Sequence, residues 1–442
     1  MDNWEAVTGP QSRLAMVSGR KIDMSRMGSA VFDCMNIDER ASSHRVGKWS
    51  LALLFVILSA GIFLRAWPTT GFHGVGYDEG IYAGYVKTAL KEGIWNYPDI
   101  VRAYVKWQEE RSDAVVPATR IGFLLPASAL AAISRLDPLT ALRCVSLVSS
   151  VLLLFATAII AYRLGGSERM LLLTVLMAVA PLQIHLAQRS LVDGYFAFWA
   201  VLCAWFLWEN LQAPKHKGWL AGYGASLFVL VLTKENAAFV FAALIIVSIV
   251  FAVFKLGRGS VFLFVVSLLA PALAVLTLAA LVGGVGEWIW FYRMFVQKSA
   301  ALSYPILFQD GAWYRYLIDF TLLSPLVAVL ALGALFQIDR ESRPDVFWAL
   351  LLGASYLVMS AVPFGMSLRF AAYWDLPLRW LALSQVLQVA EKLPRIRPLF
   401  ALAGVILILA AVDLFQYWRY FVHAQIYDPV SFQLLHASRL IK

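Results

Sequence analysis

Residues 261–283 read VFLFVVSLLAPALAVLTLAALVG and contain no charged side chain. An α-helix needs about 20 consecutive apolar residues to cross the hydrocarbon core of a bilayer, so this run is long enough to span it. The 442-residue chain as a whole has the same character, because 60% of its residues are hydrophobic and only 15% are charged. Soluble domains are about a quarter charged. We therefore expect an all-α polytopic membrane protein.

Similar apolar segments occur along most of the chain. With the run above they predict about 11 transmembrane helices, near residues 50–64, 140–162, 170–187, 195–208, 219–233, 237–254, 261–283, 320–336, 346–364, 374–390 and 399–416. The segment 121–136 is apolar but short and contains Pro126. It predicts a partial or interfacial helix.

Lysine and arginine are concentrated in five of the connections between these segments. Each connection holds two or three of them, at 163–169, 209–218, 255–259, 337–345 and 391–398. Cytoplasmic loops carry such an excess, so we place these connections and the amino terminus in the cytoplasm. The net charge of +9 then reflects orientation in the bilayer, and we expect no nucleic-acid partner.

This topology divides the chain into three parts. We expect a basic cytoplasmic tail at 1–48, a transmembrane domain at 49–416 and a carboxyl-terminal tail at 417–442 on the outer side. Two long outer loops, 67–120 and 285–318, are rich in the Trp and Tyr that favour a membrane interface. The three cysteines are scattered and indicate neither a disulfide framework nor a zinc site. The membrane we expect is the plasma (inner) membrane of a prokaryote.

The first outer loop contains an acidic pair, Asp78 and Glu79, directly before an amphipathic segment at 81–90. We expect this segment to form a helix on the membrane surface, with interfacial helices making up much of the loop. Carboxylates are favoured at helix amino termini, so the pair could simply cap the helix. It could also supply a general base at the membrane surface, or oxygen ligands for a divalent cation.

Further charged residues lie where apolar segments end on the outer side. Arg189 and Asp193 are four residues apart, and would share one helical face and form a salt bridge if the helix extends that far. Lys234 and Glu235 are adjacent, and adjacent side chains on a helix diverge by about 100°, so we expect them to have different partners. Arg369 either extends to the lipid headgroups or belongs to a site.

The predicted topology places all seven of these charged residues on one face of the membrane. A pocket that combines two acids with several cations suits an anionic, membrane-borne substrate, with cations for a phosphate and an acid for proton abstraction. The seven residues are Asp78, Glu79, Arg189, Asp193, Lys234, Glu235 and Arg369.

These motifs resemble the glycosyltransferase C superfamily. The most similar branch holds the protein O-mannosyltransferases and the aminoarabinose transferases that modify lipid A, the glycosyltransferase family 39-like enzymes. The resemblance covers about residues 50–390 and is strongest in its first two hundred. It is carried by Asp78-Glu79 with Tyr82, Pro181-Leu182 through Arg189 to Asp193 and Phe198, Thr233-Lys234, and Arg369-Phe370 with Pro377.

The resemblance implies an inverting transfer of a sugar on the extracytoplasmic face, from a polyprenyl-phosphate donor to a protein, lipid or glycan acceptor. It implies that Asp78 is the base, and that Glu79 orients the helix or shares with Asp78 a divalent metal cation that not every member needs. Arg189, Lys234 and Arg369 would bind the phosphate of the lipid-linked donor.

Four further residues are expected in the donor-binding site. Asp193 would orient Arg189, and Glu235 and Tyr82 would lie near the phosphate or the sugar. Arg120 is a further candidate phosphate ligand. It ends the sequence VPATR at 116–120, which is all that this chain has of the Pro-rich segment usually found late in the first loop. That departure leaves the acceptor open.

Two other functions remain possible from the sequence. A transporter or flippase could use the same charges to move an anionic lipid or solute, but transporters place such charges near the bilayer midplane in repeated halves. The charges here lie at the outer boundary, and the second half of the chain does not repeat the first. A scaffolding subunit could keep the fold without activity, but it would not need the acidic pair.

Overall fold

The computed structural model describes residues 47–67, 74–339, 341–362, 365–392 and 398–441. These residues form helices, turns and loops, with no strand among them. Trp49–Lys442 forms one compact unit. The tail predicted for residues 1–48 lies almost entirely outside the described residues.

The helices of the first half include α3, which carries the acidic pair Asp78 and Glu79. In chain order they are α2 (Lys48–Ala66), α3 (Tyr77–Glu92), η2 (Ile94–Asn96), α4 (Tyr97–Glu110), α5 (Ile121–Ser134), α6 (Pro138–Ala178), α7 (Pro181–Ala187), α8 (Val192–Gln212), α9 (Lys217–Thr233) and α10 (Ala237–Val253).

The second half continues the bundle and ends in short helices. Its elements are α11 (Val261–Val282), α12 (Val285–Ala300), η3 (Pro305–Gln309), α13 (Arg315–Leu323), α14 (Pro325–Leu335), α15 (Arg343–Ser360), η4 (Leu368–Trp374), α16 (Asp375–Glu391), α17 (Pro398–Tyr417), η5 (Trp418–His423) and α18 (Ser431–Ala437).

Within the described residues, most of each apolar segment predicted as a span is helical, which confirms an all-α polytopic membrane protein. Four helices are long and apolar enough to cross a membrane by length and composition: Lys48–Ala66, Pro138–Ala178, Val261–Val282 and Ala401–His423. Shorter apolar helices include α5, α9, α10 and α14. The number of crossings stays a prediction.

Two predicted spans differ from the observed helices. The span predicted at 170–187 ends at Ala178, and the chain restarts at Pro181 as the separate helix α7. The span predicted at 320–336 is divided into α13 and α14 at Pro325. In both places proline occupies the first position of the new helix, where its missing N–H needs no partner.

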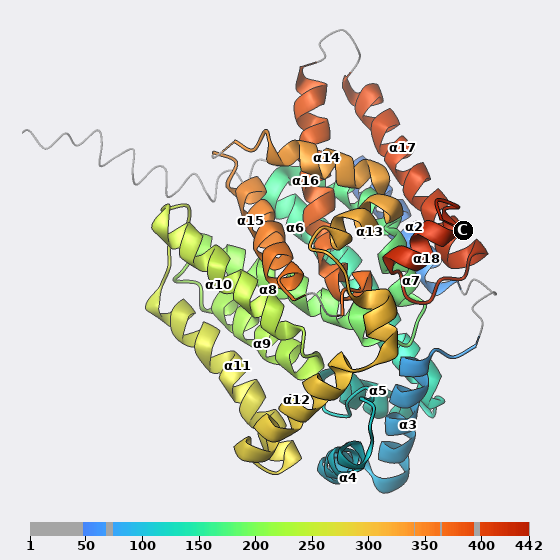
Figure 1. Cartoon of the computed structure of the whole chain (residues 1–442). Coiled ribbons are helices and arrows are strands. Elements are labelled where there is room, and N and C mark those ends of the chain that lie inside the picture. The colour runs from blue at the N-terminus through green and yellow to red at the C-terminus, as the bar shows by residue number, and fades with distance from the viewer. Residues whose placement is uncertain (1–46, 68–73, 340, 363–364, 393–397, 442) are drawn as a thin grey trace, which may run out of the picture. The chain divides into compact units, whose positions relative to one another are not determined.

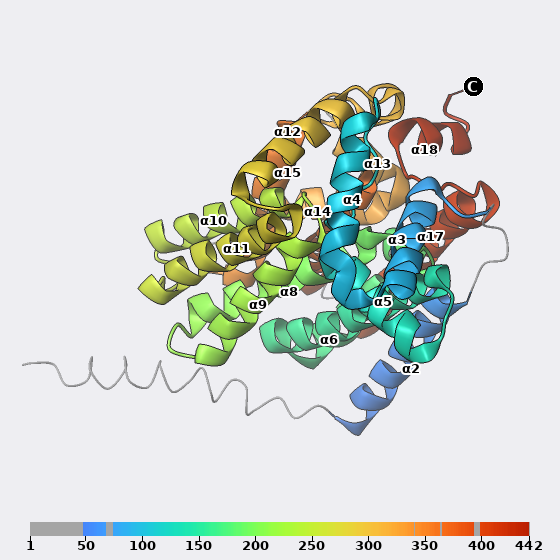
Figure 2. The same ribbon diagram turned by 90° about the horizontal axis from the view of Figure 1, so that it is seen from below.

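The helices gather in neighbouring groups within this unit (Figure 1). α8 packs against α9, and α9 packs against α11, while α14 and α15 both pack against α16. In the first outer loop α3 packs against α5 and α4 packs against α11, and Lys298 of α12 donates to the Gln108 carbonyl of α4 at 2.7 Å (Figure 2). The two long outer loops therefore meet at one end of the bundle.

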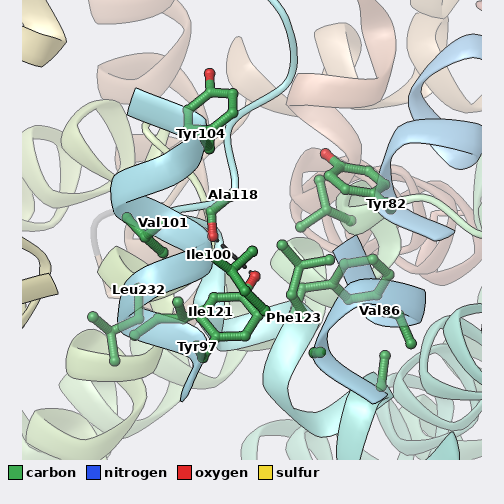
Figure 3. Close-up of a cluster of buried hydrophobic side chains, with 14 of the residues drawn as sticks. Tyr82, Val86, Tyr97, Ile100, Val101, Tyr104, Ala118, Ile121, Phe123 and Leu232 are labelled. Atoms are coloured by element: carbon green, nitrogen blue, oxygen red, sulfur yellow. Dashed lines mark hydrogen bonds between the residues drawn. The ribbon is translucent and has the colours of Figure 1, made fainter. Parts of the chain in front are cut away.

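A buried hydrophobic cluster joins the first outer loop to the bundle (Figure 3). Tyr82 and Val86 of α3 face Phe123 of α5, and the Tyr97 hydroxyl donates to the Ala118 carbonyl at 3.0 Å. The amphipathic helix predicted after the acidic pair is thus present as α3. Its apolar face packs on protein, against α5 and α6, and the segment predicted as a partial helix becomes α5.

Candidate active site

A cavity of about 740 Å³ opens where the start of α3, the start of α8, the end of α9 and the segment η4 meet. Tyr304, Pro305 and Gln309 of the second outer loop line another part of its wall. The charged side chains that line it are Asp78, Asp113, Arg120, Asp193, Lys234, Arg369 and Asp428. Most of the residues predicted to share one face therefore line one cavity.

The two members of the acidic pair have different environments. Glu79 is only 2% exposed, and its carboxylate accepts hydrogen bonds from the backbone N–H of Gly76 at 2.8 Å, the Arg189 guanidinium at 2.5 Å and the backbone N–H of Ser190 at 2.6 Å. The Asp78 side chain is 24% exposed and lines the cavity, with Oδ2 3.3 Å from Nη1 of Arg369. Glu79 caps and anchors α3, while Asp78 faces the space where a substrate would bind.

The expectation of a metal shared by this pair does not fit the geometry. Both oxygens of Glu79 already accept hydrogen bonds from protein donors, and Glu79 does not line the cavity. Within the described ranges, no group of three His, Cys, Asp or Glu side chains is arranged to hold a metal ion. In this structure the Glu79 carboxylate is occupied by protein donors and orients the start of α3.

The predicted pair of Arg189 with Asp193 is wrong. α7 ends at Ala187 and α8 begins at Val192, so the two residues are separated by a helix break and do not share a helical face. Arg189 pairs with Glu79, and Asp193 pairs with Lys234 at 2.5 Å. Asp193 therefore orients Lys234.

Lys234 and Glu235 have different partners, as their adjacency predicts. Lys234 lies against Asp193, with its Nζ 3.7 Å from the centre of the Phe370 ring. Glu235 accepts from Arg120 at 2.8 Å, and Arg120 also donates to the Tyr82 hydroxyl. Burial lowers the pKa of Lys234 to about 8, although the charge of Asp193 acts to raise it. Lys234 is thus a cation at neutral pH that can become neutral at mildly alkaline pH.

Arg369 is a buried member of the site and does not extend to the headgroups. It is 5% exposed and has three carboxylates around it. Its nitrogens lie 3.1 Å from Asp428, 3.3 Å from Asp78 and 3.9 Å from Asp193. A buried charge needs such pairing to offset its desolvation.

Two residues of the site were missed by sequence reasoning, Tyr427 and Asp428. The Tyr427 ring centre lies 4.6 Å from the Arg189 guanidinium and 5.5 Å from that of Arg369. Both residues lie in the predicted outer tail, so the topology places them on the correct face. The adjacent Tyr427 and Asp428 in that tail were the sequence feature that could have predicted their place in the site.

Arg189 was predicted to bind the donor phosphate, but it does not line the cavity. It lies behind the wall, 4% exposed, between Glu79 and Tyr427. Three cations do line the cavity, Arg120, Lys234 and Arg369. These three are the side chains placed to meet an anion there.

The fold is shared with solved membrane glycosyltransferases. The apo oligosaccharyltransferase of Archaeoglobus fulgidus superposes with a TM-score of 0.57 at 12% identity, over 84% of this chain and 56% of that one. ArnT from Cupriavidus metallidurans, bound to undecaprenyl phosphate, gives a TM-score of 0.56 at 14% identity, over 89% of this chain and 78% of that one. The archaeal AglB with an inhibitory peptide and a dolichol-phosphate gives 0.52 at 13% identity, over 84% and 55%.

The chain therefore shares the fold of these solved enzymes, in agreement with the fold that the sequence resemblance implies. It spans just over half the length of the archaeal oligosaccharyltransferase. No protein-family model matches the chain, and no curated protein matches it by sequence.

Proposed function

We propose that this chain is an integral membrane glycosyltransferase. It moves a sugar from a polyprenyl-phosphate donor to a hydroxyl or amine of an acceptor, on the extracytoplasmic side of the plasma membrane. The observation that carries the proposal is the partly exposed carboxylate of Asp78 in a cavity with three cations, within a fold whose solved examples include one bound to undecaprenyl phosphate.

Asp78 is the base in this proposal. Its carboxylate accepts the proton of the acceptor O–H or N–H as the acceptor atom bonds to the anomeric carbon. The bond between that carbon and the phosphate oxygen breaks, and the polyprenyl phosphate leaves with the electron pair. A single displacement of this kind inverts the configuration at the anomeric carbon.

Arg120, Lys234 and Arg369 bind the phosphate in this proposal. Negative charge develops on the phosphate oxygen as the sugar leaves, and fixed cations in a largely buried site stabilise that charge strongly. Each of the three is held by an acidic partner, so the cations are oriented before the donor arrives. Tyr82, Glu235 and Asp193 support them.

The test is a transfer assay with protein purified into lipid nanodiscs. Radiolabelled polyprenyl-phosphate sugars, offered one at a time, are incubated with the protein and membrane extracts that contain protein, lipid and glycan acceptors. We expect one donor to be consumed, with label appearing on an acceptor in the opposite anomeric configuration.

Empty nanodiscs and heat-treated protein are the negative controls. Retention of the anomeric configuration would contradict the single-displacement mechanism. Transport of an intact donor across the bilayer of a proteoliposome, without any cleavage of the sugar, would favour a transporter and overturn the proposal.

A further inference from the structure

The segment Ile426–Val430, between η5 and α18, carries a buried carboxylate into the site. Asp428 is 2% exposed and has partners on two other parts of the chain. On the approach to η4, Ser367 donates to it at 2.5 Å, and Nε of Arg369 lies 3.1 Å away in an ion pair that lacks hydrogen-bond geometry. From the second outer loop, Tyr304 donates at 3.0 Å and Gln309 at 2.8 Å. Asp428 therefore connects Arg369, which lines the cavity, to the second outer loop, which lines another part of the cavity wall.

The segment around Asp428 is fixed by contacts on both sides. His185 of α7 bonds to the Tyr427 carbonyl at 3.1 Å, and the Ser431 hydroxyl donates to Asp319 of α13 at 2.5 Å. Ile426 and Val430 are both buried. A carboxylate on so well-held a segment can define the position of the side chain that it binds.

Arg369 lies between Asp428 on one side and Asp78 and Asp193 on the other. If the charge of Asp428 were lost, the two remaining carboxylates would attract the guanidinium toward themselves. That movement would pair Arg369 more tightly with the proposed base and shift the guanidinium from the position in which it is proposed to bind the donor phosphate. The present arrangement shares Arg369 among three acids.

We propose that Asp428 is a positioning residue that holds Arg369 in its phosphate-binding position and limits its pairing with Asp78. This inference rests on the proposed function. Asp428 acts through Arg369 and does not itself react. The segment Ile426–Val430 is accordingly part of the active site, although it lies far along the chain from the acidic pair.

The test compares the steady-state kinetics of Asp428→Asn with those of the wild type, with the donor varied at saturating acceptor. We expect the kcat/KM for the donor to fall at least about 10-fold. The substitution keeps the size of the side chain but removes its charge. Asp99→Asn is the matched control, because it makes the same substitution at an exposed carboxylate of α4, and its kcat/KM should stay within about 2-fold of the wild type.

A double-mutant cycle separates positioning from a purely structural role. Positioning predicts that Asp428→Asn lowers kcat/KM less than about 3-fold when Arg369 is already Gln. Asp428→Glu keeps the charge on a longer side chain and should lie between the wild type and Asp428→Asn. Thermal midpoints in detergent are measured for every variant, so that any loss of folding is recorded separately.

Wild-type kinetics for Asp428→Asn, or full additivity with Arg369→Gln, would overturn the inference and leave the proposed function standing. If the wild type consumes no donor, the proposed function fails. The inference is then judged by the binding of undecaprenyl phosphate alone, for which we expect Asp428→Asn to bind at least about 10-fold more weakly than the wild type. Equal affinities would overturn it.

Discussion

The guanidinium of Arg189 donates to the carboxylate of Glu79 at 2.5 Å, and both side chains are buried. This ion pair ties the first turn of α3 to the turn between α7 and α8. Because Asp78 precedes Glu79 directly, the pair also fixes where the proposed base lies. Glu79 is therefore held by protein donors, while the carboxylate of Asp78, the proposed base, lines the cavity.

Glu79→Gln should destabilise the protein. Removing one charge of a buried ion pair leaves the other unpaired and costs about 3–5 kcal/mol. We expect a clearly lower thermal midpoint in detergent, together with loss of turnover. Glu110→Gln is the control, because Glu110 is exposed at the end of α4 and its neutralisation should leave the midpoint unchanged. A wild-type midpoint for Glu79→Gln would show that the pair does not hold α3.

Gly76→Ala should disturb the site through Tyr427. A Cβ at Gly76 would overlap ring carbons of Tyr427, and that ring is confined beside Arg189 and Arg369. We expect a lower thermal midpoint and reduced donor turnover. The same substitution at Gly84 in α3 meets no atom within 4 Å, and alanine favours a helix over glycine by about 1 kcal/mol. Equal behaviour of the two variants would contradict the close packing at Gly76.

The kcat/KM for the donor should fall above pH 8. The pKa of Lys234 is lowered to about 8 by burial, so this side chain is a cation below that pH and neutral above it. Only the cation attracts the donor phosphate, and the alkaline limb of the pH profile should follow the loss of its charge. Lys234→Arg keeps a cation at all these pH values and should remove the limb. If kcat/KM still falls near pH 8 in Lys234→Arg, the titration of another group causes the fall.

The fold was largely predictable because the bilayer imposes long apolar helices, and the sequence shows where they lie. The shared face of the charged residues followed from the basic loops on the opposite side. These features depend on local pattern, which a single sequence contains. Lys234 and Glu235 do have different partners, but both follow the end of α9 at Thr233, in extended and turn backbone, so the helix geometry behind that expectation does not apply.

Pairings across the chain were not predictable in the same way. Arg189 and Asp193 lie in the polar connection between the predicted spans 170–187 and 195–208, but their spacing of four does not show that α7 ends at Ala187 and that each residue pairs with a different partner. Asp428 meets Arg369 only through tertiary packing. Spacing along the sequence carries no information about such contacts.

The central claim is that Asp78 takes the acceptor proton. The most direct measurement compares turnover and donor binding for Asp78→Asn and the wild type, with Asp99→Asn as control because Asp99 is exposed on α4. We predict that Asp78→Asn lowers kcat at least about 100-fold while the Kd for the donor stays within a few-fold, and that Asp99→Asn matches the wild type. Wild-type turnover by Asp78→Asn would contradict the account.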